Sequence, residues 1–173
     1  RWRWHGRRPQ SHAAGVQAVI LINPYAHGGG APPPSTTHRY WQFIDLLVTD
    51  AGFFEVAEIQ LLTGSTVISE GKTYSSFSAP TLALGNLFDG STATRCYWTK
   101  TQIETSGFYI RIDLGTAMDV DGVKQAGFDD SARYMNGFTL QYSDDGTAWT
   151  TYATKTGLTY PGNNTLSSTY SVP

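Results

Sequence analysis

The sequence predicts an all-β protein built as an antiparallel β-sandwich, and three observations lead to this prediction. Residues 108–114 alternate between apolar and polar or amphipathic side chains, which is the period of a half-buried strand. A second alternating run, 138–142, is separated from a third, 148–152, by Asp145-Gly146, a strong hairpin signal. Aromatic residues make up 13% of the chain and charged residues only 15%, a balance typical of a sandwich with many turns.

The chain is expected to consist of a leader and linker, residues 1–37, followed by one domain, residues 38–173. Residues 1–15 are basic and aromatic without periodicity, whereas residues 27–37 combine three glycines, three prolines and a Ser-Thr-Thr cluster. The leader could bind an acidic partner or a membrane surface, or could be an extended tail that a neighbouring subunit orders.

The first strand of the domain is expected within residues 39–49, which are apolar at nearly every position, as in a strand buried on both faces. A turn with two exposed aromatic residues, Phe53 and Phe54, should follow. In residues 55–62, the alternation places Glu58 and Gln60 toward solvent.

The segment up to the alternating runs contains less regular structure. A short strand is expected at Val67-Ile68, and residues 71–80 are expected to form a loop. If the following segment is a strand, Cys96 and Trp98 share its inner face, with Tyr97 and Lys100 outside.

Charge argues against a nucleic-acid ligand. The net charge is −2, and without the four arginines of the leader the chain has eight basic and fourteen acidic residues, a poor match for phosphate. The longest apolar run, residues 18–22, is far below the ~20 residues of a membrane span, so a soluble protein is expected. Cys96 is the only cysteine, which excludes an intrachain disulfide.

The distribution of histidine argues against catalysis. All four histidines precede or border the expected domain: His5, His12, His27 and His38. The sequence therefore predicts neither a Ser-His-Asp or Cys-His catalytic group nor a His/Cys zinc site within the sandwich. The two carboxylate pairs, Asp129-Asp130 and Asp144-Asp145, are interpreted as turn formers.

Three motifs in order resemble one family. They are Asp89-Gly90 followed by Thr94, Ile-Arg-Ile-Asp-Leu-Gly at 110–115, and Tyr-Ser-Asp-Asp-Gly at 142–146 with Trp149. Together they resemble the discoidin family of coagulation-factor type C domains and related galactose-binding-like, carbohydrate-binding modules. Arg39-Tyr40-Trp41 and residues 57–61 are similar to the strands that precede such a domain in bacteriophage tail and virion proteins.

The resemblance implies a discoidin-like jelly-roll β-sandwich with a possible structural Ca²⁺ in the loop that begins at Asp89. Asp89 and Thr94 would supply side-chain oxygens, and the carbonyls of Leu87 and of Ser91 or Thr92 would complete the site. The alternative is a plain Asp-Gly turn. Calcium-binding members often offer a late acidic ligand, which residues 167–173 lack.

The resemblance also implies that loops at one end of the sandwich hold the ligand. A sugar site needs an aromatic platform and a few polar groups, and the candidate residues in loops are Phe53, Phe54, Tyr97, Lys100, Arg133, Tyr134 and Asn136. The same residues would suit a protein interface.

The function expected from these features is non-catalytic. The chain would be a module of a phage or phage-like virion protein, in a tail fibre, spike or decoration protein, that binds bacterial surface polysaccharide. Residues 1–37 would dock onto other virion subunits, and a homo-oligomer would raise weak glycan affinity through avidity. The alternatives are a purely structural assembly protein and an appended module of a secreted glycoside hydrolase.

Overall fold

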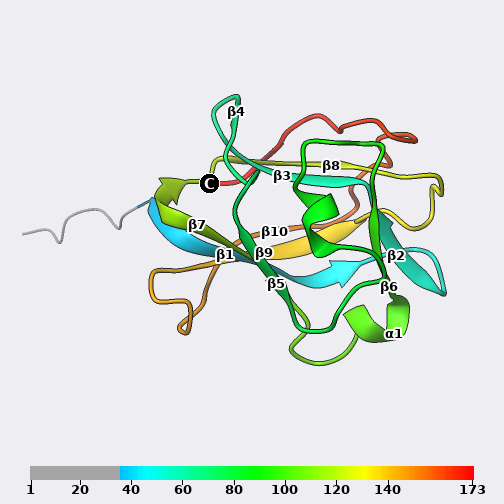
Figure 1. Cartoon of the computed structure of the whole chain (residues 1–173), viewed down its shortest axis with the longest axis horizontal. Coiled ribbons are helices and arrows are strands. Elements are labelled where there is room, and N and C mark those ends of the chain that lie inside the picture. Colours follow the sequence, from blue (N-terminus) through cyan, green and yellow to red (C-terminus); the bar gives the residue numbers. More distant parts are fainter. Residues whose placement is uncertain (1–35) are drawn as a thin grey trace, which may run out of the picture. The chain divides into compact units, whose positions relative to one another are not determined.

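Two antiparallel sheets enclose an apolar core in the computed structural model, which describes residues 36–173 (Figure 1). Five strands form the larger sheet in the order β10-β9-β1-β7-β5. Their bounds are Thr37–Leu47 for β1, Thr73–Ser76 for β5, Ile110–Asp119 for β7, Gly137–Ser143 for β9 and Thr150–Lys155 for β10. The fold is therefore the predicted all-β sandwich.

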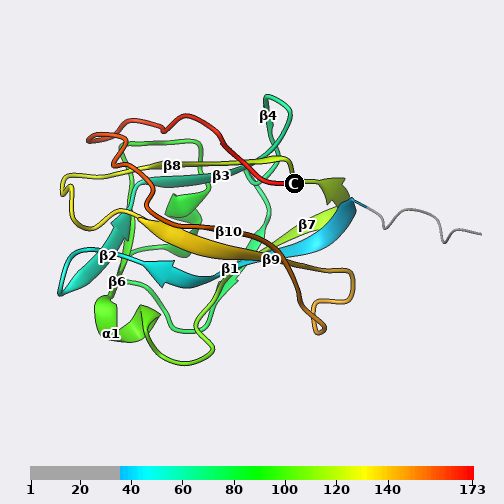
Figure 2. The ribbon, with the colours of Figure 1, turned by 180° about the vertical axis from the view of Figure 1, so that it is seen from behind.

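The second sheet has the order β11-β8-β3-β4, and a separate two-stranded ribbon pairs β2 with β6. The bounds are Phe53–Val56 for β2, Glu58–Thr63 for β3, Thr66–Val67 for β4, Cys96–Thr99 for β6, Gly122–Ala126 for β8 and Tyr170–Ser171 for β11. Two short helical segments, η1 (Leu84–Leu87) and α1 (Lys100–Ile103), flank β6. The ribbon and α1 lie at the opposite end of the sandwich from the C-terminus (Figures 1 and 2).

The core follows the predicted alternation where the sequence alternates most clearly. Phe108, Ile110, Ile112 and Leu114 are buried, which confirms the inward face of β7. In the hairpin, β9 and β10 pair antiparallel around Asp145-Gly146, and the Asp145 carboxylate accepts hydrogen bonds from the backbone amides of residues 147 and 148. These amides lower the pKa of Asp145.

The small ribbon places Cys96 and Trp98 on one face, as expected. Both side chains are fully buried, and the Trp98 indole nitrogen donates to the Ser78 carbonyl oxygen at 3.0 Å. Burial raises the pKa of the Cys96 thiol to about 12, so this cysteine is an inert part of the core.

Some predictions for the first half of the domain are wrong. Glu58 is fully buried and Gln60 is 7% exposed, although both were expected to face solvent. The reason is that β3 is an inner strand of its sheet and that the Gly90 loop lies against Glu58. Residues 73–76, expected in a loop, form edge strand β5 against β7. Phe53 and Phe54, expected in a turn, begin strand β2.

Strand β1 shows why the prediction of burial on both faces was only partly right. Trp41 and Phe43 are fully buried toward the core and Gln42 is 5% exposed on the other face. The register then shifts between Ile44 and Leu47, and this irregularity leaves Leu47 44% exposed at the strand end.

Both ends of the described chain meet at the turn between β7 and β8. Thr37 is paired with Asp119, and the Val172 amide donates to the Asp121 carbonyl oxygen at 3.0 Å. The compact unit spans Pro34–Pro173. Most of the predicted leader and linker, residues 1–35, lies outside the described residues.

Candidate functional site

The β2–β6 ribbon presents an aromatic pair at one end of the sandwich. Phe54 pairs with Trp98 in register, and both side chains are fully buried. Phe53 and Tyr97 therefore point the other way, with their rings 5.9 Å apart in an edge-to-face arrangement. Phe53 is 37% exposed, so this pair offers an apolar surface to solvent.

Two arginines frame this aromatic pair. The Arg133 guanidinium lies 5.2 Å from the Phe53 ring centroid, and that of Arg95 lies 5.8 Å from the Tyr97 ring centroid. Both reach the buried Glu55 carboxylate, at 3.3 and 3.0 Å respectively. The five residues line a small cavity of about 170 Å³. We call this group, Phe53, Glu55, Arg95, Tyr97 and Arg133, the loop-end site.

The predicted ligand residues divide between this site and the core. Phe53, Tyr97 and Arg133 belong to the loop-end site, and the Lys100 ammonium lies nearby, 3.3 Å from the Asp50 carbonyl oxygen. Arg95 and Glu55 were not among the ligand residues expected from the sequence. The alternation of the ribbon could have revealed Glu55, because Glu55 is paired with Tyr97 across the strands.

Three of the predicted residues have structural roles instead. Phe54 is fully buried and Tyr134 is 7% exposed, so neither ring is available as a sugar platform. The Tyr134 hydroxyl donates to the Leu158 carbonyl oxygen at 2.6 Å, and the Asn136 side-chain amide donates to the same oxygen at 3.0 Å. These bonds hold Leu158 against the segment that leads into β9.

The exclusion of histidine from the sandwich was wrong, because His38 lies inside β1. Its Nδ1 atom is 2.9 Å from the Asp144 carboxylate, and its ring stacks on Tyr142 with 3.6 Å between centroids. The residue is only 4% exposed, which leaves no room for a substrate beside the imidazole. This His-Asp pair fastens the β9–β10 hairpin to β1.

The loop after η1 brings together Asp89, Thr94 and the Ser91 carbonyl oxygen, which are some of the groups that the resemblance implied for calcium. The Thr94 hydroxyl lies 2.9 and 3.1 Å from the two Asp89 carboxylate oxygens and 3.2 Å from the Ser91 carbonyl oxygen. The Ser91 amide donates to Asp89 at 2.9 Å. Leu87, the last residue of η1, has a fully buried side chain and could contribute only its carbonyl oxygen.

Glu58, from β3, is a buried acidic residue beside this loop, although the alternation of the sequence placed it toward solvent. One carboxylate oxygen accepts a hydrogen bond from the Gly90 amide at 3.3 Å, whereas Oε2 is buried without any hydrogen-bond partner. Burial, together with the negative charges of Asp89 and Glu70, raises the pKa of Glu58 to about 8. An unpartnered buried carboxylate oxygen fits a site for a cation.

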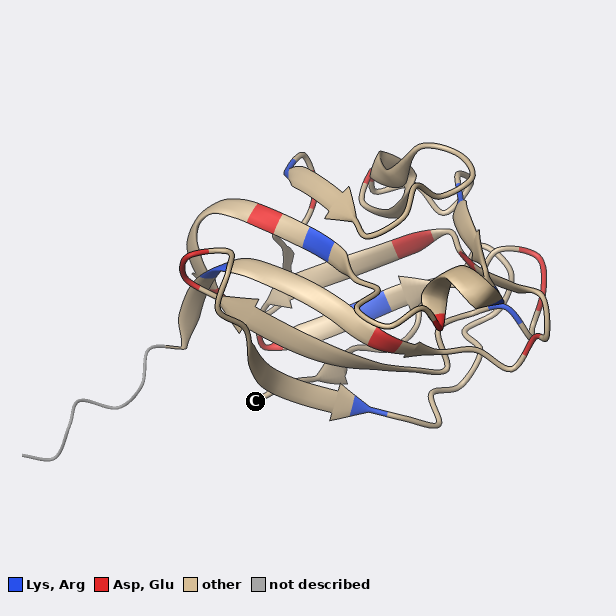
Figure 3. Cartoon of the chain, turned by 90° about the horizontal axis from the view of Figure 1, so that it is seen from below, with Lys and Arg blue, Asp and Glu red and all other residues tan. Residues whose placement is uncertain are grey.

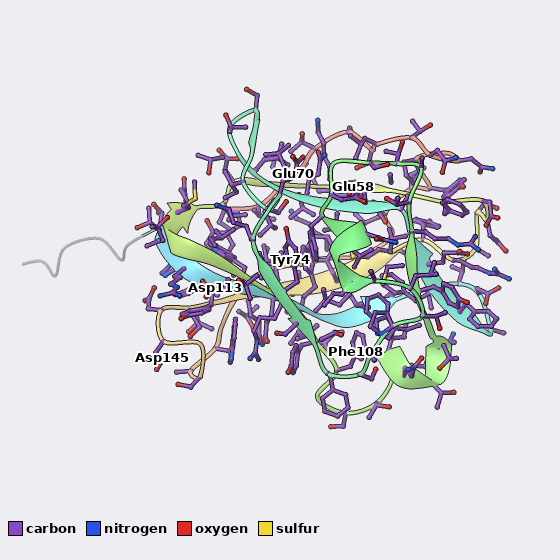
Figure 4. The ribbon with its side chains drawn as sticks, viewed as in Figure 1. Glu58, Glu70, Tyr74, Phe108, Asp113 and Asp145 are labelled. Atoms are coloured by element: carbon purple, nitrogen blue, oxygen red, sulfur yellow. The ribbon has the colours of Figure 1, made fainter. Side chains whose placement is uncertain are left out.

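Glu70 approaches the same loop from the other side. Gly90 has a φ of +76°, and a methyl group added to it would lie 3.1 Å from a Glu70 carboxylate oxygen. A cavity of about 510 Å³ opens beside Glu70, Tyr74 and Asp89. Figure 4 labels Glu58, Glu70 and Tyr74 in this part of the molecule. Within residues 36–173, no group of three His, Cys, Asp or Glu side chains is arranged to hold a metal ion, so a cation here would also need hydroxyl and carbonyl oxygens.

Charged residues of both signs are interspersed along the strands and loops, and no single basic face stands out in the view of Figure 3. Within the described residues, no helix has the length and apolar character needed to cross a membrane.

Comparison with known proteins gives one match. The F5/8 type C domain model matches residues 69–172, more than half of the chain. No curated protein and no solved structure matches the chain. The match begins after β4, although β1 and β3, which precede it, occupy inner positions in the two sheets.

Proposed function

The chain belongs to the F5/8 type C, or discoidin, domain family, and from this membership we propose that it is a glycan-binding module of a phage or phage-like virion protein. Domains of this family are typically non-catalytic modules that bind carbohydrate or protein. The proposed ligand is bacterial surface polysaccharide, and the proposed location is a tail fibre, spike or decoration protein of the particle.

The loop-end site is the observation that supports glycan binding. Sugars present an apolar ring face and a rim of hydroxyls, so their sites combine an exposed aromatic surface with a few fixed polar groups. Phe53 and Tyr97 provide the surface, while Arg95 and Arg133 are held in place by Glu55. Asp130 and Asp50 also lie near Arg133, and Asp129 lies near Arg95. The arginine N–H groups that face none of these carboxylates are donors for sugar hydroxyls.

Calcium is the proposed structural cofactor. Asp89, Thr94, the Ser91 carbonyl and Glu58 would hold the ion, whose charge would neutralise the buried Glu58 carboxylate. Glu58 would provide the acidic ligand that the C-terminal segment lacks. The ion would fix the 89–94 loop, which leads directly into Arg95 and Tyr97 of the loop-end site.

The virion context rests on the similarity of the first strands to those of phage tail and virion proteins. Residues 1–37 would attach the module to other virion subunits, and a homo-oligomer would present several loop-end sites to a repetitive polysaccharide. Repetition raises the apparent affinity of weak sites without any new contact.

A structural assembly role is the second candidate, because two large apolar residues five positions apart in the sequence are exposed. Phe77 is 49% and Leu82 is 50% exposed, and Leu82 has a φ of +73°. Neither contributes to the loop-end site. Exposed apolar side chains of this kind suit a protein contact in a particle.

The test is binding of the full chain to purified surface polysaccharides of candidate hosts, with wild type compared with Tyr97→Ala and Phe53→Ala. We expect each variant to bind at least about tenfold more weakly, since each removes half of the aromatic platform. Phe77→Ala is the matched control, an exposed aromatic residue elsewhere on the domain, and should bind like wild type. Absence of glycan binding, with loss of particle assembly in Phe77→Ala, would favour the assembly role.

A further inference from the structure

The outer face of the five-stranded sheet has a row of polar side chains that crosses all five strands. In register, Thr151 of β10, Gln141 of β9, Gln42 of β1, Arg111 of β7 and Ser75 of β5 lie side by side. Hydrogen bonds link four of them: Gln141 donates to Thr151 at 3.3 Å, Gln42 to Gln141 at 2.7 Å, and Arg111 to Gln42 at 2.9 and 3.2 Å. Each of these four side chains is thus held in place by a hydrogen bond to its neighbour.

A cavity of about 650 Å³ lies against the middle of this row. Gln42, Arg111 and Gln141 line its floor, the irregular end of β1 at 44–47 lines one side, and the segment 103–109 between α1 and β7 lines the other. Phe108, labelled in Figure 4, anchors that segment, because it is 3% exposed and packs edge-to-face on Trp98 at 5.8 Å. The volume is within the range of small-molecule and saccharide sites.

Arg111 is the charged group on the cavity floor. Its guanidinium lies between two rings, 4.1 Å from the Tyr109 centroid and 4.4 Å from the Trp149 centroid. Within residues 36–173 no carboxylate lies within 4.0 Å of it, whereas each of the other three arginines of this range is paired with one: Arg39, Arg95 and Arg133.

The hydrogen bonds of Arg111 leave donors free for a ligand. A guanidinium has five N–H donors, and Arg111 uses its Nε and one Nη2 donor on the neutral Gln42 amide. The remaining edge can bind a carboxylate in a two-point geometry, for which arginine is the best-suited side chain. The two flanking rings hold that edge in one orientation.

Asp45 supplies an acceptor on the cavity wall. It is exposed and has a φ of +50°, a conformation that non-glycine residues rarely adopt. Asp45 lies within the register irregularity of β1, between Ile44 and Leu47, and lines the cavity. Glu104, whose carboxylate lies 3.7 Å from the Lys100 ammonium, also lines the cavity. Two carboxylate acceptors, two amides and a guanidinium with free donors around one cavity match a polyhydroxylated ligand that also carries an anion.

We infer that this cavity, which we call the sheet-face site, binds a carboxylated sugar residue of an acidic polysaccharide. The sugar carboxylate contacts Arg111, and the ring hydroxyls contact Gln42, Gln141 and Asp45. The inference rests on the proposed glycan-binding function but places a second subsite on the sheet, apart from the loop-end site, and defines the ligand as acidic.

The experiment compares two forms of the same ligand. Uronic-acid-containing bacterial polysaccharides are used in native form and after carboxyl reduction, which replaces each carboxylate by a hydroxymethyl group and leaves the linkages intact. We expect the full chain to bind the native form, and both carboxyl reduction and Arg111→Gln to weaken binding by roughly tenfold to a hundredfold. The two losses should not add, because they remove the two partners of one contact.

Two further variants keep the test independent of folding. Ser106→Trp fills the cavity from an exposed loop position and should also abolish the preference for the native form. Arg39→Gln removes the same charge from a neighbouring strand outside the cavity and should bind like wild type. Thermal unfolding of each variant shows whether it remains folded.

The outcomes separate this inference from the proposed function. Binding that is insensitive to carboxyl reduction, or unchanged in Arg111→Gln and Ser106→Trp, overturns the sheet-face site. If Tyr97→Ala abolishes binding while Arg111→Gln and Ser106→Trp leave it unchanged, the glycan-binding function stands and the second subsite is refuted. If neither acidic nor neutral glycans bind, the proposed function fails as well.

Discussion

Replacing Glu58 by Gln should change how the stability of the domain depends on pH. The pKa of Glu58 is raised from an ordinary value of 4.5 to about 8, so the folded state binds this proton more tightly than the unfolded state. The stabilising protonated form is fully present below about pH 4.5 and is lost as pH rises through about 8. A shift of this size corresponds to about 5 kcal/mol of unfolding free energy lost across that range.

The assay is urea unfolding at pH 5, 6, 7, 8 and 9 in the presence of a chelator, followed by tryptophan fluorescence. Trp41 and Trp98 are fully buried and report on the core. We expect the wild type to lose several kcal/mol between pH 5 and 9 and Glu58→Gln to lose little, because an amide does not titrate. Glu104→Gln, a change at an exposed carboxylate, is the matched control and should follow wild type.

At high pH, calcium should stabilise the wild type more than it stabilises Glu58→Gln. An ion held by Glu58 and Asp89 competes with the proton, so calcium should stabilise the wild type most above pH 8, by about 2.7 kcal/mol at a hundredfold excess over its Kd. Glu58→Gln should gain far less. A wild-type stability that stays level from pH 5 to 9 in chelator, or an equal pH slope in Glu58→Gln, would refute the assignment of the raised pKa.

Three further predictions concern the fold. Trp98→Ala should lower the unfolding free energy by about 3–5 kcal/mol in urea denaturation, since it leaves a cavity under the β2–β6 ribbon; a loss below 1 kcal/mol would contradict its core role. Gly90→Ala should cost about 1–2 kcal/mol, because its φ is +76° and Glu70 must move; unchanged stability would show that the loop is free to rearrange. Asp145→Ala should lower the thermal midpoint at pH 7, and the midpoints of the variant and the wild type should converge in strong acid. The reason is that the fold lowers the pKa of Asp145, so this carboxylate stabilises the domain above its ordinary pKa and stops doing so as pH falls. A difference that persists in strong acid would exclude this cause.

The sandwich was predictable because strong local patterns and family motifs coincide in residues 108–152. The side chains of 108–114 alternate without exception, so a single register satisfies the core, and the structure follows it. The same stretch contains the hairpin and most of the motifs that resemble the discoidin family. The family match over residues 69–172 confirms that resemblance.

The first half of the domain was harder to predict because burial there depends on neighbours that are distant in sequence. Glu58 sits in an alternating run and should face solvent by periodicity, yet η1 and the Gly90 loop cover the outer side of β3. Phe54 is buried because its strand pairs with the one that contains Trp98, a pairing of segments more than forty residues apart. The local periodicity of a strand does not show whether a distant segment of the chain buries its outer face.

The sequence by itself determined the all-β class, the family, the hairpin and the meeting of Asp89 with Thr94, because these depend on short spacings along the chain. Only the tertiary structure decided which chemical groups share a site. It placed Glu58 beside the Asp89 loop, joined Arg95 and Arg133 to Glu55, and aligned Gln42 with Arg111 and Gln141. The physical reason is that strand register and sheet order, which bring distant residues together, are set by packing of the whole core rather than by any local pattern.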